Sequence, residues 1–241
     1  MKDKVLFVIP AYNEEQNIKK VLDEIKKDVS YADILVINDC STDNTMEIVE
    51  KENVKCISNC FNMRYAMAVQ TGIKYASYHN YDYVIQMDAD GQHIASEAEK
   101  LYKKMKETDC DIVIGSRYLK DLGYRCPFFR RVGTKLFEIM INVFCHKKIK
   151  DPLSGFQCIN KRVINEYAKI GGYPEYPDAN LIMEMLLRGY KVCEVPVKMR
   201  LRENGESMHS GIIKPIKYMI EMFYTIIIIF IKNIGIRRVN K

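Results

Sequence analysis

The chain has 241 residues, of which 48% are hydrophobic and 28% charged, and its formal net charge is +6 at pH 7. This length and composition suit one sizeable globular core, or two fused halves that share a sheet. The positive charge favours anionic partners such as phosphates or an acidic membrane surface, and the chain lacks the basic and aromatic motifs of a nucleic-acid-binding protein.

The first 116 residues alternate short apolar strands with amphipathic helices. The expected strands are residues 5–9, 34–37, 54–57, 83–87 and 112–114, and the expected helices are residues 14–27, 41–50, 65–78 and 96–106. We expect Ser41 to cap the second helix, and Ser96 and Glu99 to form a capping box for the fourth.

Alternation of strands and helices predicts a parallel sheet with helices against it. In such open sheets ligands lie beyond the carboxyl ends of the strands. The loops that follow Ile9, Ile37 and Met87 should therefore meet at one site.

The strand expected at residues 83–87 ends in two carboxylates, Asp88 and Asp90. An isolated Asp-x-Asp often does no more than close a strand with a polar turn. At the end of a buried strand, however, two such side chains can converge on one hard cation. Mg²⁺ and Mn²⁺ take one or two carboxylates together with substrate phosphates, so the pair favours a diphosphate-binding site.

The second half is less regular. We expect a loop at residues 118–129, helices at 130–145 and 161–169, a short strand after Phe156, and a last strand at 192–197. Asp178 could cap a helix that Gly189 ends. With no linker between the halves, residues 1–211 are expected to form one catalytic domain, with a donor half at about 1–116 and an acceptor half at about 117–211.

Residues 212–241 form a distinct apolar and basic tail, expected to be a C-terminal helix. Its apolar stretch, residues 218–231, would make about 21 Å of helix, which is short of the roughly 30 Å of a bilayer core. Lysines and arginines on both sides of this stretch suit a helix that lies in the headgroup region. The alternative is a helix packed on the domain or on a dimer partner.

The eight cysteines stand at positions 40, 56, 60, 110, 126, 145, 158 and 193. They include no Cys-x-x-Cys pair and no zinc-ligand spacing. Because no signal peptide precedes the first strand, we expect reduced thiols in a cytosolic protein.

Five segments carry a pattern of motifs: residues 9–15 (IPAYNEE), 36–43 (VINDCSTD), 88–93 (DADGQH), 114–117 (IGSR) and 151–156 (DPLSGF). In order and spacing they resemble the family 2 glycosyltransferases, inverting enzymes of the A-type nucleotide-sugar fold, over about residues 4–210. Within that family the chain is most similar to polyprenyl-phosphate sugar transferases and their bacterial polysaccharide-biosynthesis relatives. The resemblance implies an α/β fold with a Rossmann-like, mostly parallel central sheet flanked by helices.

The resemblance also implies a donor pocket in the first half. The residues expected to bind the base, ribose and diphosphate of a nucleotide sugar are Pro10, Tyr12, Glu14, Asp39, Arg64 and Asp88. The resemblance assigns Mg²⁺ or Mn²⁺ to Asp90, with Asp88 and Gln92 as further ligands. Such a cation would neutralise the departing nucleoside diphosphate.

On the acceptor side, a polyprenyl phosphate is already nucleophilic and needs cations to place it. The residues expected to bind this phosphate are Arg117, Arg131, Arg202 and Ser207, because guanidinium groups match phosphate oxygens. If the acceptor is instead a sugar hydroxyl of a polysaccharide or lipid-linked glycan, a carboxylate base is needed, and Asp151 and Asp178 are the candidates. Arg117, Asp151 and Asp178 are therefore the expected catalytic residues.

The chain departs from the family pattern at three glycine positions, where it has Cys40, Arg64 and Ala66. Glycine permits positive φ and close backbone approach, and Arg64 could instead supply a cation to the diphosphate. A nucleotidyltransferase would share the sheet and the Asp pair, but it usually has a glycine-rich basic loop after the first strand. A non-catalytic nucleotide-binding partner is a further alternative.

The leading hypothesis is thus a metal-dependent inverting glycosyltransferase that uses a nucleotide-diphosphate sugar and a polyprenyl phosphate. Its expected location is the cytoplasm, at the inner face of the cell membrane, with peripheral membrane contact. No nucleic-acid partner is expected, and a homo-oligomer is left open.

Overall fold

A computed structural model of the chain describes residues 3–125, 128–171, 173–202 and 213–239. The strands are β1 (Val5–Ala11), β2 (Asp33–Asn38), β3 (Lys55–Ser58), β4 (Tyr83–Gln86), β5 (Ile112–Ser116), β6 (Gln157–Asn160) and β7 (Val192–Pro196). The α-helices are α1 (Ile18–Asp28), α2 (Thr45–Lys51), α3 (Arg64–Tyr78), α4 (Ala98–Glu107), α5 (Phe128–Cys145), α6 (Lys161–Lys169), α7 (Ala179–Leu187) and α8 (Ile213–Val239).

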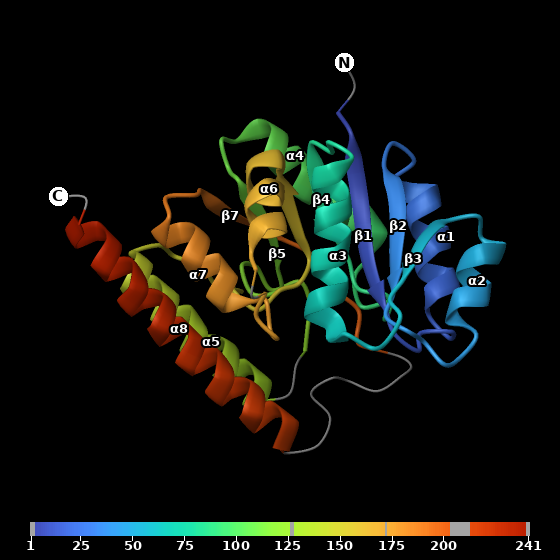
Figure 1. The fold of residues 1–241 in the computed structure, drawn as a ribbon. Helices are drawn as coiled ribbons and strands as arrows, with labels where there is room; N and C mark the ends of the chain where they lie inside the picture. Colours follow the sequence, from blue (N-terminus) through green and yellow to red (C-terminus); the bar gives the residue numbers. More distant parts are fainter. Residues whose placement is uncertain (1–2, 126–127, 172, 203–212, 240–241) are drawn as a thin grey trace.

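These strands form one 7-stranded sheet in the order β3-β2-β1-β4-β6-β5-β7 (Figure 1). Among the described strands, only β6 runs against its neighbours β4 and β5, and the other pairings are parallel. The mostly parallel sheet predicted from the sequence is confirmed. The carboxyl ends of β1, β2, β4 and β5 consequently lie at the same edge.

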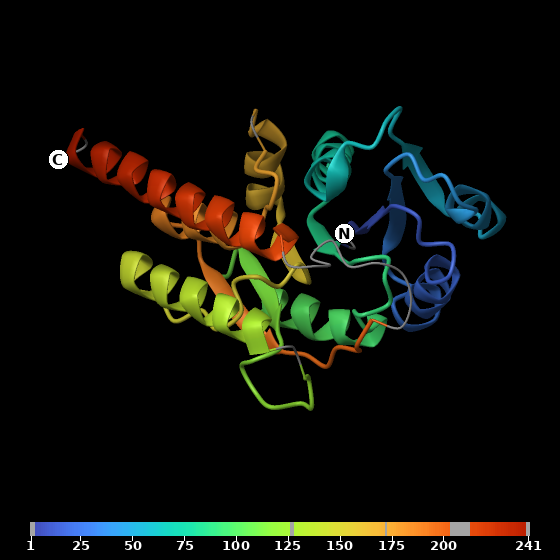
Figure 2. The same cartoon turned by 90° about the horizontal axis from the view of Figure 1, so that it is seen from below.

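Side chains of the central strands alternate between two buried cores, as the pleat requires. Leu6 and Val8 of β1 pack with α3, α6 and α7 on one face of the sheet. Phe7 and Ile9 pack with α1 and α4 on the other face. The view from below shows these helices on opposite sides of the sheet (Figure 2). The strands are therefore held rigidly from both faces, which fixes the loops at their ends.

Two expected helix caps are wrong. The Ser41 hydroxyl accepts the backbone N–H of Asn13 at 3.0 Å, and α2 begins only at Thr45, whose N–H is bound by Asp43. Ser96 lies in the short 3₁₀-helix η1 (Ala95–Glu97) that precedes α4, without a side-chain cap. The carboxylate of Glu99 accepts the Tyr31 hydroxyl at 2.9 Å instead. Both predictions failed because these side chains bind groups that are distant in sequence.

The helix α7 begins directly after Asp178, as expected, but the carboxylate makes no capping hydrogen bond. Helix α1 starts at Ile18, later than expected, because residues 14–17 form a turn after Asn13, which has φ of 54°. The backbone N–H groups of Asn17 and Ile18 both bind the Glu14 carbonyl.

The tail helix α8 is longer than the sequence predicted, with 27 residues. It packs on α7 and lies beside α5 at one end of the molecule (Figures 1 and 2). Tyr218, Met222 and Ile226 are buried in this contact. No helix within the described residues is both long enough and apolar enough to cross a membrane.

Cys110 and Cys193 form a disulfide between the start of β5 and its partner strand β7, with Cα atoms 6.2 Å apart. The expectation that all the cysteines are reduced is therefore wrong for this pair. The sequence spacing did not indicate it because the two residues meet only through strand pairing, 83 residues apart.

Two of the positions where the family pattern has glycine keep a glycine-like backbone here. Cys40 has φ of 61° and Arg64 has φ of 69°, in the left-handed region where a Cβ atom is strained. Ala66 lies inside α3 and is buried. Non-glycine residues at positions 40 and 64 therefore adopt a backbone conformation that costs conformational energy.

Cys40→Gly should raise the free energy of unfolding by about 0.5–1 kcal/mol, because glycine adopts positive φ without the Cβ clash. The matched variant Cys40→Ala keeps the Cβ atom and should stay within about 0.5 kcal/mol of the parent protein. Equilibrium urea unfolding of the three proteins measures both differences, and equal stabilities for the glycine and alanine variants would show that residue 40 is not strained.

Candidate active site

Carboxylates and arginines predicted from the sequence gather at the carboxyl edge of the sheet. Asp39 follows β2, Asp88 follows β4 within two residues, and Arg117 follows β5 directly. Pairing of β1 with both β2 and β4 brings the loop that carries Glu14 between them. The predicted convergence of the loops after β1, β2 and β4 is therefore found.

Asp88 is held by a tyrosine that the sequence analysis did not assign. The Tyr65 hydroxyl donates to Asp88 Oδ1 at 2.8 Å and accepts from Gln86 Nε2 at 2.8 Å. A Cβ atom on Gly155 would lie 2.9 Å from this hydroxyl. The glycine of the DPLSGF segment thus leaves the space that Tyr65 fills. Its position in a motif was visible in the sequence, but its contact was not.

Asp90 lies close to Asp88 in a tight turn. Asp90 Oδ1 accepts the backbone N–H of Gln92 at 3.0 Å. Burial raises the pKa of Asp90, and the neighbouring charge of Asp88 raises it further. Burial also raises the pKa of Asp88, against the hydrogen bond from Tyr65. Two carboxylates that repel each other in this way are stabilised by a cation between or beside them.

Arg202 supplies one such positive charge. Its Nε atom lies 3.6 Å from Asp90 Oδ2, and its Nη2 atom donates to Glu14 Oε1 at 2.7 Å. Burial raises the pKa of Glu14, against the hydrogen bond from Asn17 and the charge of Arg202. The structure thus brings Arg202, which the resemblance assigned to the acceptor phosphate, next to the donor carboxylates.

Asp39 ties the loop after β2 to the start of α3. Its Oδ1 atom accepts Asn59 Nδ2 at 2.7 Å and the backbone N–H of Met63 at 2.9 Å. Arg64 follows directly, but its guanidinium forms an ion pair with Glu175 in the loop before α7. Its side chain is 66% exposed, so it can turn toward a ligand at low cost.

The remaining donor-side residues are placed as follows. Pro10 is buried inside β1 opposite Ile37, and Tyr12 is exposed just beyond the strand. The Gln92 side-chain amide donates to the Arg200 carbonyl at 3.4 Å. His93 Nδ1 accepts the backbone N–H of Asp88 at 3.0 Å, and burial lowers the His93 pKa to about 4. His93 is thus a neutral support for the Asp88 loop.

Arg117 and Asp151 form a buried pair on the acceptor side. The backbone N–H and Nε of Arg117 each donate to Asp151 Oδ2 at 2.8 Å, and Nη2 donates to Oδ1 at 2.7 Å. Glu194 fixes the Asp151 loop by accepting the N–H groups of Lys150 and Asp151. Because both oxygens of Asp151 already bind Arg117, this geometry favours a positioning role for Asp151 over that of a base.

Arg131 lies near this pair. Both arginines lie against the Tyr118 ring, with Arg131 Cζ 3.8 Å and Arg117 Cζ 5.4 Å from its centroid. Both guanidinium groups therefore contact the same tyrosine, which brings two positive charges together at this side of the site. Ser207, the fourth residue expected at the acceptor phosphate, lies outside the described residues.

Asp178 sits between the two halves of the site. Its Oδ2 atom accepts the hydroxyl of Tyr218 from α8 at 2.9 Å. Burial raises the pKa of Asp178 to about 7, and the charges of Asp88 and Asp151 add to the increase, against Tyr218 and Arg117. A carboxyl group with this pKa exchanges its proton near neutral pH, which suits a general base.

The residues around Asp88 and Asp90 fit a hard divalent cation. Their oxygens are the ligand type that Mg²⁺ and Mn²⁺ prefer. The Arg202 guanidinium compensates part of the negative charge of Asp90. Within the described residues, no group of three or more His, Cys, Asp or Glu side chains is arranged to hold a metal ion. Such a cation would consequently need further oxygens from a bound phosphate.

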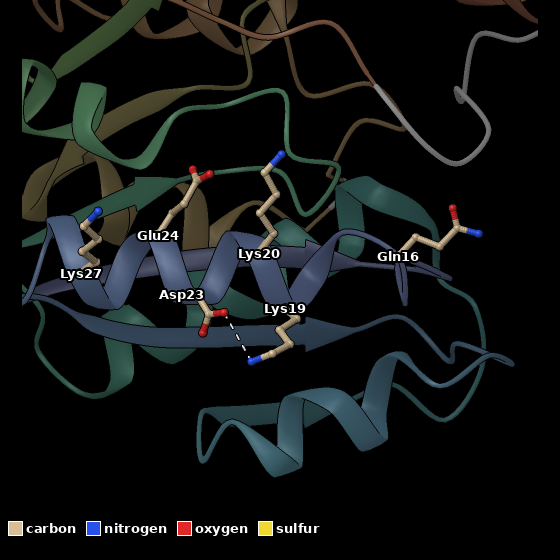
Figure 3. Close-up of a pocket in the computed structure, with 6 residues that line it drawn as sticks. All are labelled: Gln16, Lys19, Lys20, Asp23, Glu24 and Lys27. Atoms are coloured by element: carbon tan, nitrogen blue, oxygen red, sulfur yellow. Dashed lines mark ion pairs between the residues drawn. The ribbon is translucent and has the colours of Figure 1, made fainter.

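A surface groove lies elsewhere, along α1. Its lining residues are Gln16, Lys19, Lys20, Asp23, Glu24 and Lys27 (Figure 3). Lys19 pairs with Asp23 at 3.3 Å, and Glu24 binds Arg200. Because these charges compensate one another on the surface of one helix, the groove is not a candidate active site.

Comparison with known proteins agrees with this geometry. The glycosyl transferase family 2 model matches residues 6–168. A dolichol-phosphate mannosyltransferase of Pyrococcus furiosus is 35% identical over 223 residues, which are 86% of this chain and 60% of that relative. An uncharacterised protein of Methanocaldococcus jannaschii is 30% identical over 226 residues, which are 92% of this chain and 91% of that relative.

A solved structure is also similar in fold. Glucosyl-3-phosphoglycerate synthase from Mycobacterium tuberculosis, in complex with Mn²⁺, uridine diphosphate and glucosyl-3-phosphoglycerate, superposes with a TM-score of 0.69. The sequences are 17% identical, and the match covers 97% of this chain and 80% of that chain. At this identity the likeness concerns the fold alone, and it confirms the nucleotide-sugar fold expected from the sequence.

The Asp178 pKa predicts how stability depends on pH. Because the pKa is raised in the folded state, the folded protein binds this proton more tightly than the unfolded chain, and its stability falls as pH rises from about 4 to about 7. Asp178→Asn removes this loss and should be more stable than the parent at pH 8, by on the order of 1–3 kcal/mol.

Urea unfolding between pH 4 and pH 8 measures this effect. The exposed carboxylate Asp28 provides the control variant Asp28→Asn, which should follow the parent at every pH. A constant difference between Asp178→Asn and the parent across this range would contradict a raised pKa.

Proposed function

The chain belongs to glycosyl transferase family 2, and we propose that it transfers a sugar from a nucleotide-diphosphate donor to a polyprenyl phosphate, with inversion at the anomeric carbon. Its general activity is that of a nucleotide-sugar glycosyltransferase. The observation that carries the finer proposal is the half-buried pair Asp88 and Asp90 beside Arg202, with Arg117 near enough for its charge to lower the pKa of Asp88.

The donor would lie across the ends of β1, β2 and β4. Tyr12 offers an exposed ring edge to the nucleoside. Glu14 and Asp39, buried carboxylates at the ends of β1 and β2, would exchange some of their present partners for ribose hydroxyls and base N–H groups. Arg64 directly follows Met63, whose backbone N–H is bound by Asp39. We propose that Arg64 leaves Glu175 and binds the diphosphate, replacing the backbone contact that a glycine would allow.

Asp88 and Asp90, with Gln92 as a further ligand, would hold Mg²⁺ or Mn²⁺. When bound, the cation supplies Lewis-acid stabilisation to the leaving nucleoside diphosphate. Tyr65 keeps the Asp88 carboxylate oriented, and the neutral ring of His93 holds its backbone. Arg202 would add positive charge on the same side of the diphosphate, which favours departure of the leaving group.

Arg117 and Arg131 would place the acceptor phosphate. Arg117 is fixed by Asp151, so its guanidinium loses little freedom on binding an anion. A phosphate oxygen is already negative, so attack at the anomeric carbon needs alignment more than proton removal. Attack opposite to the leaving diphosphate in a single displacement inverts the anomeric carbon. The similarity to a relative named dolichol-phosphate mannosyltransferase supports this acceptor.

A second candidate function is extension of a polysaccharide or lipid-linked glycan at a sugar hydroxyl. It is favoured by one observation, the pKa of about 7 at Asp178 beside the site. A hydroxyl must lose its proton during attack, and a carboxylate with that pKa is suited to accept it.

We further propose that the protein acts at the cytoplasmic face of the cell membrane, because a polyprenyl phosphate resides in lipid. The proposed catalytic domain is residues 1–211, with residues 212–241 as the tail in contact with the membrane. A homo-oligomer is compatible with this arrangement.

Donor binding can be tested by thermal unfolding with UDP, GDP, dTDP and CMP, with and without Mn²⁺. One diphosphate should raise the Tm by about 5–10 °C at saturation and only with the metal present. Asp90→Asn should lose this increase, because the metal loses a ligand. The control Asp23→Asn, on the outer face of α1, should keep it. An equal increase without Mn²⁺, or in Asp90→Asn, would contradict the metal site.

The acceptor class can be tested by steady-state transfer to a polyprenyl phosphate. Arg131→Ala should raise the KM for this acceptor by about tenfold or more, since a charge-assisted contact is lost. The control Lys120→Ala, at an exposed basic residue of the loop after β5, should leave this KM unchanged. Asp178→Asn should leave kcat within about threefold of the parent if no base is needed. A fall in kcat of about 10²-fold or more in Asp178→Asn would favour the hydroxyl acceptor instead.

A further inference from the structure

The helices α5 and α8 pack against each other in parallel. A Cβ atom on Gly133 of α5 would lie 2.9 Å from Met219 Sδ of α8, so the missing side chain lets the two helices approach closely. Further along, the rings of Phe144 and Phe230 stack with centroids 4.3 Å apart. The distance in sequence from Gly133 to Phe144 on α5 equals that from Met219 to Phe230 on α8, so the two helices stay in register along this contact.

Each helix buries one side in the domain. Phe137 and Ile141 of α5, and Tyr218, Met222 and Ile226 of α8, lie in the core shared with α3, α6 and α7. The contacts between the two helices occupy the neighbouring side of each. In two parallel helices this arrangement leaves the third side of both pointing the same way, opposite the core.

That outer side is apolar on both helices and exposed. Its exposed members on α5 recur at helical spacing: Val132, Leu136, Ile139 and Val143. Those on α8 do the same: Ile216, Ile220, Phe223, Tyr224, Ile228 and Ile231. We call these ten side chains the two-helix face. Exposure reaches 63% at Ile220, and an apolar surface of this extent on one side of a protein indicates a binding surface.

The fully exposed charges at the border of this face are basic, although Lys135 pairs with Glu138 and Lys217 with Glu221. Among the described side chains of these helices, 131–145 and 214–233, every exposed charged residue is basic: Arg131, Lys135, Lys214, Lys217 and Lys232. The two acids are not exposed, since Glu138 is buried and Glu221 is half-buried. Exposed basic residues also follow α5, at Lys147 and Lys148. An apolar surface bordered by lysine and arginine is complementary to anionic lipid headgroups above acyl chains.

We propose that the two-helix face binds the surface of an anionic lipid bilayer, with α5 and α8 lying together in the headgroup region. Arg131 belongs both to the border of this face and to the arginine pair around Tyr118. A lipid-anchored phosphate could therefore reach Arg131 and Arg117 without leaving the bilayer. This last step rests on the proposed acceptor, whereas binding to lipid does not.

A second copy of the chain would fit the face less well. Two such faces brought together would oppose basic borders, and like charges facing each other repel. The face also offers few polar groups for specific hydrogen bonds, with only the hydroxyl of Tyr224 among its ten side chains. An anionic lipid surface attracts the basic border, and it needs no specific hydrogen bonds to the apolar side chains.

Vesicle flotation of the full chain tests the proposal. The purified protein should float with vesicles of equal parts phosphatidylcholine and phosphatidylglycerol, and much less with phosphatidylcholine alone or at high salt. Ile139→Glu on α5 and Ile220→Glu on α8 should each weaken vesicle binding by about tenfold or more. The control Tyr78→Glu, an exposed aromatic residue at the end of α3, should bind as the parent does.

Circular dichroism melting of each variant checks that it is folded, and light scattering without lipid gives its oligomeric state. The proposal is overturned if the parent does not float, or if only the α8 variant loses binding, because the face then does not include α5. A parent dimer that Ile139→Glu dissociates, without vesicle binding, would identify a second copy as the occupant.

The acceptor assignment is measured separately, with a short-chain polyprenyl phosphate that is soluble in water. Ile139→Glu and Ile220→Glu should transfer sugar to this acceptor as the parent does, and lose transfer only to a long-chain acceptor in vesicles. Vesicle binding with the expected variant pattern, but no transfer to either acceptor, would support the lipid-binding face and contradict the proposed function.

Discussion

The arrangement of the site follows from the repulsion between Asp88 and Asp90, two carboxylates that the end of β4 brings together in a partly enclosed place. Burial and mutual charge raise the pKa of Asp90, so the ionised pair is unfavourable unless its surroundings compensate. Compensation comes from three directions: the hydroxyl of Tyr65, the guanidinium of Arg202 and the backbone N–H of Gln92. These groups come from separate parts of the chain, so the folded sheet is needed to assemble them. Replacing one of the two acids would remove the repulsion, so keeping both is expected of a protein that binds a cation here.

Much of this was predictable because it depends on local periodicity. Apolar runs of three to six residues identified the strands, and the abrupt change to Asp88 and Asp90 identified the edge where the acidic side chains gather. The failures have a common cause. Ser41, Glu99 and Cys110 each interact with a residue distant in sequence, and local rules for caps and cysteine spacing contain no information on such partners. Arg202 could be identified as a site residue from its motif. Its position beside the donor carboxylates Glu14 and Asp90, however, depends on the path of the chain after β7. Tyr65 carried no signal of its own beyond its place in a segment where the family has glycines.

A glycine can both adopt positive φ and let a ligand approach the backbone closely, and residues 40 and 64 keep only the first of these properties. At residues 40 and 64 the positive φ is retained although the side chain is now cysteine or arginine. Contacts on either side hold this backbone in place: Asn38 accepts the N–H of Ser41, and Asp39 accepts the N–H of Met63. Close approach of a ligand to the backbone is the role that these side chains obstruct. The exposed, movable guanidinium of Arg64 is consistent with recognition of the donor by a side chain in place of the main chain.

The candidate site can form during folding only after the antiparallel strand β6 has paired with β4 and β5. It is inserted between β4 and β5, so that both neighbours of β5, β6 and β7, follow β5 in the sequence. The segment just before β6 also delivers Gly155 to Asp88 and Asp151 to Arg117. A growing chain that has completed β5 therefore has its carboxylate pair but not the strand that encloses it. Pairing across such sequence distances is slow compared with helix formation, so the nascent protein should pass through a stage in which the edge of β4 is open and the residues of the candidate site are not yet held together.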